Sequence, residues 1–105
     1  MTDDDFEWDD DKAVENYAKH GVSFDRARHA FSDPFGVGEI DDREDYGEDR
    51  FTIVGMVEGT LIFVAYTERV VRDDRGSRDR VRIISARRAT PHEQDDYFEQ
   101  NGQTP

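Results

Sequence analysis

One segment, Arg78 to Thr90 (RDRVRIISARRAT), joins the clearest buried strand of the chain to its densest positive charge. Strict strand alternation divides its side chains between two faces: Val81, Ile83, Ser85 and Arg87 on one, and Arg80, Arg82, Ile84, Ala86 and Arg88 on the other. Thr90, Pro91 and Glu93 then have the spacing of a helix N-cap, first helical position and capping box. The fold must therefore anchor this strand in a core, expose its guanidinium groups and turn at a defined corner.

Length and composition limit the chain to a single small domain. The 105 residues suffice for one core, so we expect one domain over residues 1–105, with a frayed tail from about 101 to 105. No apolar run is long enough to span a membrane, and the start MTDDDFEWDDDK is unlike the basic and apolar start of a signal peptide, which predicts a cytoplasmic protein. With no cysteine and three scattered histidines, we expect neither a metal site nor a cofactor.

The net charge of −12 argues against an ordinary nucleic-acid binder, but its distribution is uneven. Between Glu68 and Arg88, eight arginines face four acidic residues, a local charge of 8 − 4 = +4, which leaves −16 on the rest of the chain. Two interpretations stay open. The segment can be an anion-binding strand pair, or it can be a solvated hairpin with interspersed charges, and composition alone favours the hairpin.

The acidic remainder is rich in Asp and nearly free of Lys, with Lys12 and Lys19 against 14 − 2 = 12 arginines. Such a surface repels itself at low ionic strength, whereas concentrated salt screens the repulsion. The composition therefore indicates adaptation to high salt. An acidic decoy that binds basic partners is the weaker alternative.

The first third of the chain predicts a short strand and two helices. Phe6 to Trp8 alternates as a strand does, and a helix follows to His20, where Gly21 supplies a left-handed stop. Its predicted apolar stripe contains Ala13, Val14, Tyr17, Ala18 and His20. Ser23 caps a second helix that Asp33-Pro34 ends, and together the two helices predict a helical hairpin.

The remainder predicts an antiparallel β-meander and a terminal helix. The expected strands are 37–42, 51–57, 61–67 and the Arg80 strand, with an acidic turn at 45–49 and a hairpin turn at Glu58-Gly59-Thr60. Residues 70–79 are expected to form a solvated loop, although its arginines Arg72, Arg75 and Arg78 can also contact substrate. The last helix, Pro91 to about Gln100, is amphipathic through Tyr97 and Phe98.

Two segments resemble the BrnT family of toxins from type II toxin–antitoxin pairs: FEWDDDKAVENYAKHGVSFDRA near the start, and ERV followed by RVRIISARRAT. The resemblance implies an α+β fold of the RelE-like ribonuclease type, in which an N-terminal helical hairpin packs on an antiparallel sheet with a C-terminal helix. It also implies a metal-independent endoribonuclease that cleaves free or ribosome-bound RNA to inhibit translation. A BrnA-like antitoxin would neutralise the toxin and contact operator DNA.

The resemblance further implies that arginines of the central strands hold the scissile phosphate. The matching positions in this sequence are Arg69, Arg82, Arg87 and Arg88. Strict alternation puts Arg82 and Arg88 on one face, so these two rank above Arg87, which can instead pair with Glu68 or the terminal helix. That helix, HEQDDYFEQ, is more acidic than the family pattern, which puts RNA contact by the helix in doubt.

The polar KHG motif supplies Lys19, as a possible phosphate ligand, and His20, whose ordinary pKa suits acid–base catalysis. A histidine on the apolar stripe of a helix is more often a hydrogen-bonded core residue, and that interpretation of His20 is favoured. Glu68 can act on the substrate as a base or pair with Arg87, and pairing is favoured. His92 is expected at the surface. Because no acid–base pair stands out, the alternative function is an inactive domain that only binds the antitoxin.

Overall fold

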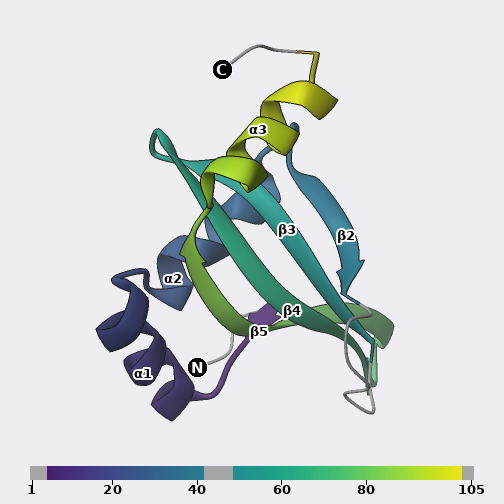
Figure 1. The fold of residues 1–105 in the computed structure, drawn as a ribbon. Coiled ribbons are helices and arrows are strands. Elements are labelled where there is room, and N and C mark those ends of the chain that lie inside the picture. The colour runs from purple at the N-terminus through teal and green to yellow at the C-terminus, as the bar shows by residue number, and fades with distance from the viewer. Residues whose placement is uncertain (1–4, 42–48, 103–105) are drawn as a thin grey trace.

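A five-stranded sheet forms the centre of the protein, a computed structural model of which describes residues 5–41 and 49–102 (Figure 1). The strand order is β1-β5-β4-β3-β2, with the bounds β1 Phe6–Glu7, β2 Val37–Asp41, β3 Arg50–Val57, β4 Thr60–Asp73 and β5 Gly76–Arg88. The predicted meander of β2 to β5 is antiparallel, as expected. The predicted acidic turn at 45–49 lies, apart from Asp49, outside the described residues.

The sheet is mixed, because β1 runs parallel to β5. A wholly antiparallel sheet was therefore the wrong expectation. No tight turn joins β1 to β5, so their direction is set by packing and not by a hairpin: Phe6 packs against the core, Trp8 lies in it, and Glu7 between them points to the other face. The pairing aligns Phe6 with Val81 and Glu7 with Arg82.

Helices cover the two faces of the sheet unequally. On one face lie α1 (Asp10–His20), α2 (Phe24–Ala27) and the 3₁₀ helix η1 (Arg28–Ser32), and over one end of the other face lies α3 (Pro91–Gln100). The first core contains Val22, Phe24, Ile62, Val64 and Ile83, and the second is smaller and includes Val54 and Tyr97. None of the described helices is long and apolar enough to cross a membrane.

The predicted N-terminal hairpin is not clearly formed, because the second helix is one α-turn that continues as the 3₁₀ helix η1. Its buried residues are Phe24, Ala27 and Ala30, which face the sheet. A side chain at Gly55 of β3 would collide with the backbone of Ala30, so this glycine lets η1 lie directly on the strand. The segment therefore packs onto the sheet more than onto α1.

Helix α1 buries a different face from the predicted one. Val14 and Tyr17 are 70% and 60% exposed, and His20 is exposed too, whereas Asn16 is buried. The Asn16 amide donates to the carbonyls of Val22 (3.0 Å) and Ala86 (2.9 Å), and its oxygen accepts from the Ala86 amide (3.1 Å). Asn16 thus bonds to backbone groups at the edge of β5 that lies beyond the short β1. The buried side chain of α1 is therefore a polar residue outside the predicted apolar stripe.

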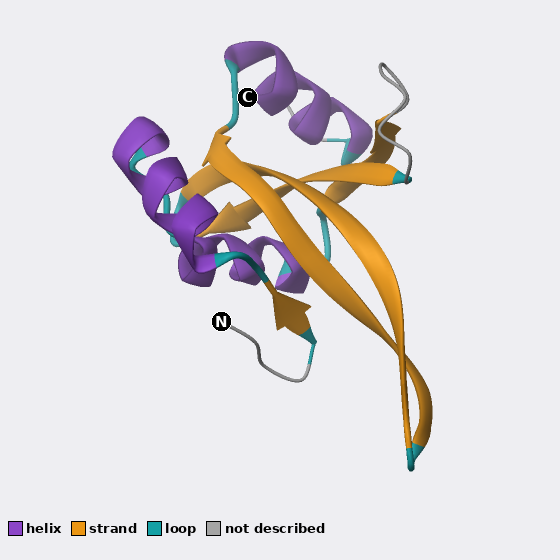
Figure 2. Cartoon of the chain, turned by 90° about the horizontal axis from the view of Figure 1, so that it is seen from below, coloured by secondary structure: helices purple, strands orange, loops and turns teal. Residues whose placement is uncertain are grey.

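Strands β4 and β5 continue as a two-stranded ribbon well past their neighbours, where we expected a solvated loop over 70–79. Figure 2 shows the ribbon projecting from the body of the protein. Pairing extends to Asp73 opposite Gly76, and the tip is closed by Asp73 Oδ1, which accepts from the Arg75 amide at 2.8 Å, and by Gly76 at φ 114°. Val70 and Val71 favour a strand despite the surrounding charges. We call residues 68–80 the ribbon.

Candidate functional site

A β-bulge in β5 decides which arginines share a face of the sheet. Tyr66 pairs with Ile83 and the adjacent Ala65 pairs with Ser85, so Ile84 is unpaired and the alternation shifts by one residue. This is why Ile83 and Ala86, three residues apart, both lie in the core under the helices. The prediction from strict alternation was therefore wrong.

After the bulge, Arg82 and Arg87 lie together on the face that α1 and α2 leave open. Arg82 pairs with Thr67 and Arg87 with Phe63, and these partners are four residues apart on β4. Arg88 pairs with the buried Ile62 and hence belongs to the helix-covered face, where its side chain is exposed at the strand end. The expected pair of Arg82 and Arg88 is replaced by Arg82 and Arg69.

Arg69 and Arg82 meet on Glu7, a residue that sequence reasoning missed. Their Nη1 atoms donate to the same carboxylate oxygen, Glu7 Oε2, at 2.7 and 2.9 Å. Glu7 is 6% exposed, whereas the two arginine side chains are 53% and 39% exposed. A buried carboxylate thus holds two guanidinium groups whose remaining N–H donors are open to a ligand. The only sequence signal was a lone polar residue between two apolar ones in Phe6-Glu7-Trp8.

Arg87 is held at the other end of the same face. Its guanidinium makes two hydrogen bonds to Glu93 of α3, at 2.8 and 3.0 Å, and lies 4.0 Å from the centre of the Phe63 ring. Burial alone would raise the pKa of Glu93, but hydrogen bonds from Arg87 and Thr90 outweigh it and lower the pKa. Of the two partners considered for Arg87, Glu68 and the terminal helix, it is the helix that Arg87 contacts.

Glu68 does not pair with Arg87, contrary to the favoured prediction. It lies opposite Val81 on the helix-covered face and is exposed, close enough to Tyr66 for its charge to add to burial in raising the pKa of that phenol. The bulge again explains the error, because it turns Arg87 to the face opposite Glu68.

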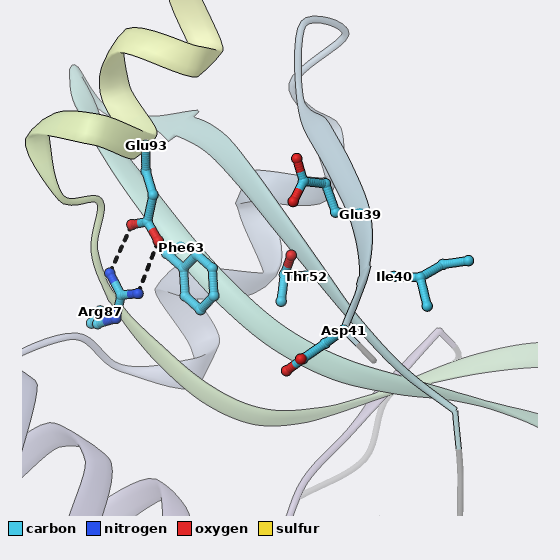
Figure 3. Close-up of a pocket in the computed structure, with 7 residues that line it drawn as sticks. All are labelled: Glu39, Ile40, Asp41, Thr52, Phe63, Arg87 and Glu93. Atoms are coloured by element: carbon cyan, nitrogen blue, oxygen red, sulfur yellow. Dashed lines mark hydrogen bonds and ion pairs between the residues drawn. The ribbon is translucent and has the colours of Figure 1, made fainter. Parts of the chain in front are cut away.

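A cavity of about 300 Å³ lies beside Arg87 (Figure 3). Its lining includes Glu39, Asp41, Thr52, Phe63, Arg87 and Glu93, with Ile40 pointing away. Three carboxylates against one paired guanidinium make this end unfavourable for phosphate. Roughly 13 Å away along β4, by the strand rise from Phe63 to Thr67, Arg69 and Arg82 share the carboxylate of Glu7. Arg80 lies opposite Arg69 on the neighbouring strand. The charge balance therefore favours an anion at the Glu7 end.

Lys19 and His20 lie at the edge of β5. They line a groove of about 280 Å³ together with Lys12, Glu15, Asn16, Ile84 and Ser85. The exposure of His20 contradicts its interpretation as a core histidine, and the groove brings it to the strand that carries Arg82. His92 is at the surface, as expected, with its Nε2 3.5 Å from Asp96. Within residues 5–41 and 49–102, no three His, Asp or Glu side chains are arranged to hold a metal ion.

Comparison with known proteins identifies the family. A search of curated proteins yields no match. A family model described as the ribonuclease toxin BrnT of type II toxin–antitoxin systems matches residues 8–93, which include Arg69, Arg82, Arg87, Glu93 and the KHG motif. Because the match spans most of the 105 residues, the chain belongs to the BrnT family of ribonuclease toxins.

Proposed function

We propose that this protein is a metal-independent endoribonuclease that cleaves RNA to inhibit translation, with the scissile phosphate bound by Arg69 and Arg82. The observation that carries the proposal is the sharing of Glu7 Oε2 by these two guanidinium groups on the open face of the sheet. A fixed pair of arginines, charged at any working pH, matches the oxygens of a phosphate.

The proposed reaction uses the RNA's own 2′-oxygen. That oxygen forms a bond to the adjacent phosphorus, its proton passes to a base, and the bond from phosphorus to the 5′-oxygen breaks as an acid protonates the leaving group. Negative charge grows on the non-bridging oxygens, and Arg69 and Arg82 donate to them. Glu7 acts as a positioning residue, because it restricts both side chains before substrate arrives.

His20 is our candidate for the acid–base role and Lys19 for an additional phosphate contact. Both line the groove at the edge of β5 with Ser85, whose neighbour across the strand pair is Ala65 on the open face. Arg87 and Arg88 rank below Arg82, since Arg87 is bonded to Glu93 and Arg88 lies on the other face. A direct role for Glu68 loses support, because it faces away from Arg82.

One observation favours the alternative, a domain that binds its antitoxin without cleaving RNA. The candidate acid–base group, His20, belongs to α1 at the sheet edge and not to the face that carries Arg69 and Arg82. In either case the family implies a cognate antitoxin. We propose that this antitoxin is a BrnA-like protein that neutralises the toxin in the cytoplasm. The complex of the two proteins would contact operator DNA only through the antitoxin. A RelE-like fold is likewise inferred from the family resemblance.

The proposal is tested by bulk RNA cleavage in the presence of a chelator. Arg82→Ala should lower the rate by about 10² to 10³, as for one preorganised donor, and Arg82→Lys should recover part of it because charge returns without the planar fork. Arg72→Ala, which removes an equal charge from the far face of the ribbon, is the control. Full activity in Arg82→Ala would refute the assignment.

Two further results separate the functions. Growth arrest on induction of the chain, relieved by co-expression of its neighbouring gene, supports the toxin. Antitoxin binding by a wild-type protein that leaves RNA intact with and without divalent ions selects the inactive domain. Cleavage that stops in chelator would instead require a metal and contradict this mechanism.

A further inference from the structure

The two faces of the ribbon differ in charge. Arg69 pairs with Arg80 and Val71 with Arg78, so Arg69, Arg78 and Arg80 share the face that continues into Arg82. Including Arg82, this face carries four arginines against Glu7 and Asp73, a net charge of 4 − 2 = +2. The opposite face carries Arg72 against Glu68 and Asp79, a net charge of 1 − 2 = −1. We call the first the arginine face.

The positive charge on the arginine face is poorly compensated by the protein. Arg69 and Arg80 are direct cross-strand partners, and like charges in that position destabilise a strand pair. Arg78 approaches Asp73 only to 3.8 Å, too far for a hydrogen bond. The Nε of Arg80 is enclosed and has no hydrogen-bond partner in the described structure. The arrangement is one that a bound anion would stabilise.

The ribbon also lacks support from the rest of the sheet. β3 pairs with β4 only up to Tyr66, and β1 pairs with β5 only at Val81 and Arg82. An isolated two-stranded ribbon is only marginally stable in water. We therefore infer that the projecting part contributes to binding and not to the stability of the fold. Over Arg69 to Asp73 its length is roughly 13 Å at the strand rise, enough for more than one phosphate.

We propose that the arginine face of the ribbon binds the phosphates of single-stranded RNA that flank the cleavage site, with Arg78 and Arg80 as the contacts beyond Arg69 and Arg82. This proposal extends the function proposed above, since it gives the path of the RNA away from the scissile phosphate. The acidic cavity beside Arg87 lies at the other end of the open face and repels the chain there. The RNA therefore leaves the site along the ribbon.

The test measures how salt affects binding of 2′-O-methyl RNA, which cannot supply the attacking hydroxyl and so is not cleaved. For single strands, the slope of log K against log salt is about 0.7 per phosphate contact, so Arg78→Ala/Arg80→Ala should reduce it by about 1.4 on an oligonucleotide of about 12 nucleotides. The double lysine variant should keep most of the slope because it keeps the charge. Arg72→Ala, on the opposite face of the same ribbon, should match the wild type.

Substrate length supplies a second measurement. The double alanine variant should lose affinity for the long oligonucleotide and bind one of about 4 nucleotides as the wild type does, because the short one occupies only the Arg69–Arg82 end. Melting curves of all variants check that the body remains folded. Equal loss in Arg72→Ala, or an unchanged slope in Arg78→Ala/Arg80→Ala, overturns the proposal. The proposal is also overturned if the double alanine variant binds RNA normally but fails to bind the antitoxin.

The outcomes also separate this proposal from the catalytic one. If wild-type protein binds the long oligonucleotide with the expected slope but cuts no RNA, the proposed function fails and the ribbon's role in binding stands. If RNA is cleaved and the double alanine variant binds and cuts both lengths normally, the catalytic proposal stands and the ribbon proposal fails.

Discussion

Glu7→Gln tests whether the buried carboxylate positions the arginine pair. The substitution keeps the side-chain shape but removes the charge, so that the amide oxygen remains only as a neutral acceptor for the two guanidinium groups. Breaking a fully buried ion pair costs about 3 to 5 kcal/mol. Here only Glu7 is buried and the arginines are 53% and 39% exposed, so we discount the cost to about 2 kcal/mol. For a domain of this size that corresponds to a melting temperature about 8 to 16 °C lower.

The effect on catalysis should separate binding from rate. Loss of a negative charge beside Arg69 and Arg82 leaves phosphate attraction intact or stronger, so KM should stay unchanged or fall. Because the guanidinium groups of Arg69 and Arg82 become less ordered, kcat should fall about 100-fold. A displacement of a catalytic group by about 1 Å has an effect of this size. Both constants are measured below the melting temperature, on bulk RNA in chelator.

Asp25→Asn is the matched control, since it breaks a surface pair with Arg28 in which the side chains are 63% and 33% exposed. It should cost less than about 1 kcal/mol and leave kinetics unchanged. A Glu7→Gln variant that melts like the wild type, or keeps its kcat, would refute the positioning role. A fall in activity equal to the loss of folded protein would assign Glu7 to stability alone.

Three further expectations concern stability. Thr90→Ala should cost about 1 kcal/mol, because it removes the hydroxyl that accepts from the Glu93 amide at 3.3 Å; indistinguishable urea midpoints would contradict this. Burial raises the pKa of Asp33, but hydrogen bonds from two backbone amides and Tyr97 outweigh burial and lower this pKa below its ordinary value of 3.8. The carboxylate therefore stabilises the folded protein fully above pH 3.8, and this stabilisation is lost as the pH falls through the pKa that Asp33 has in the folded state. The stability difference between wild type and Asp33→Asn should shrink over that acid range, and a constant difference would refute the linkage. If the acidic surface reflects salt adaptation, the melting temperature should still rise with KCl above about 1 M, where the Debye length is near 3 Å; a flat curve would remove the argument.

Features that depend on neighbouring residues were readable from the sequence. The capping box of Thr90 and Glu93 is present, with reciprocal bonds of 3.3 and 2.9 Å. The hairpin turn forms at Glu58 and Gly59, both at positive φ. Gly21 ends α1 at φ 70°. Such signals act over three or four residues, where propensity and local hydrogen bonds decide the conformation.

The arrangement of the arginines was decided by tertiary structure. The bulge at Ile84 exists because β4 and β5 must each bury their own apolar residues, and one extra residue reverses every side chain beyond it. Glu7 reaches Arg69 and Arg82, 62 and 75 residues away, only through the parallel pairing of β1 with β5. Asn16 is buried because it meets the open edge of β5. The sequence therefore determined which residues are basic and where the elements begin, whereas long-range pairing determined which of those charges meet, because the faces of a strand are defined only against its neighbours.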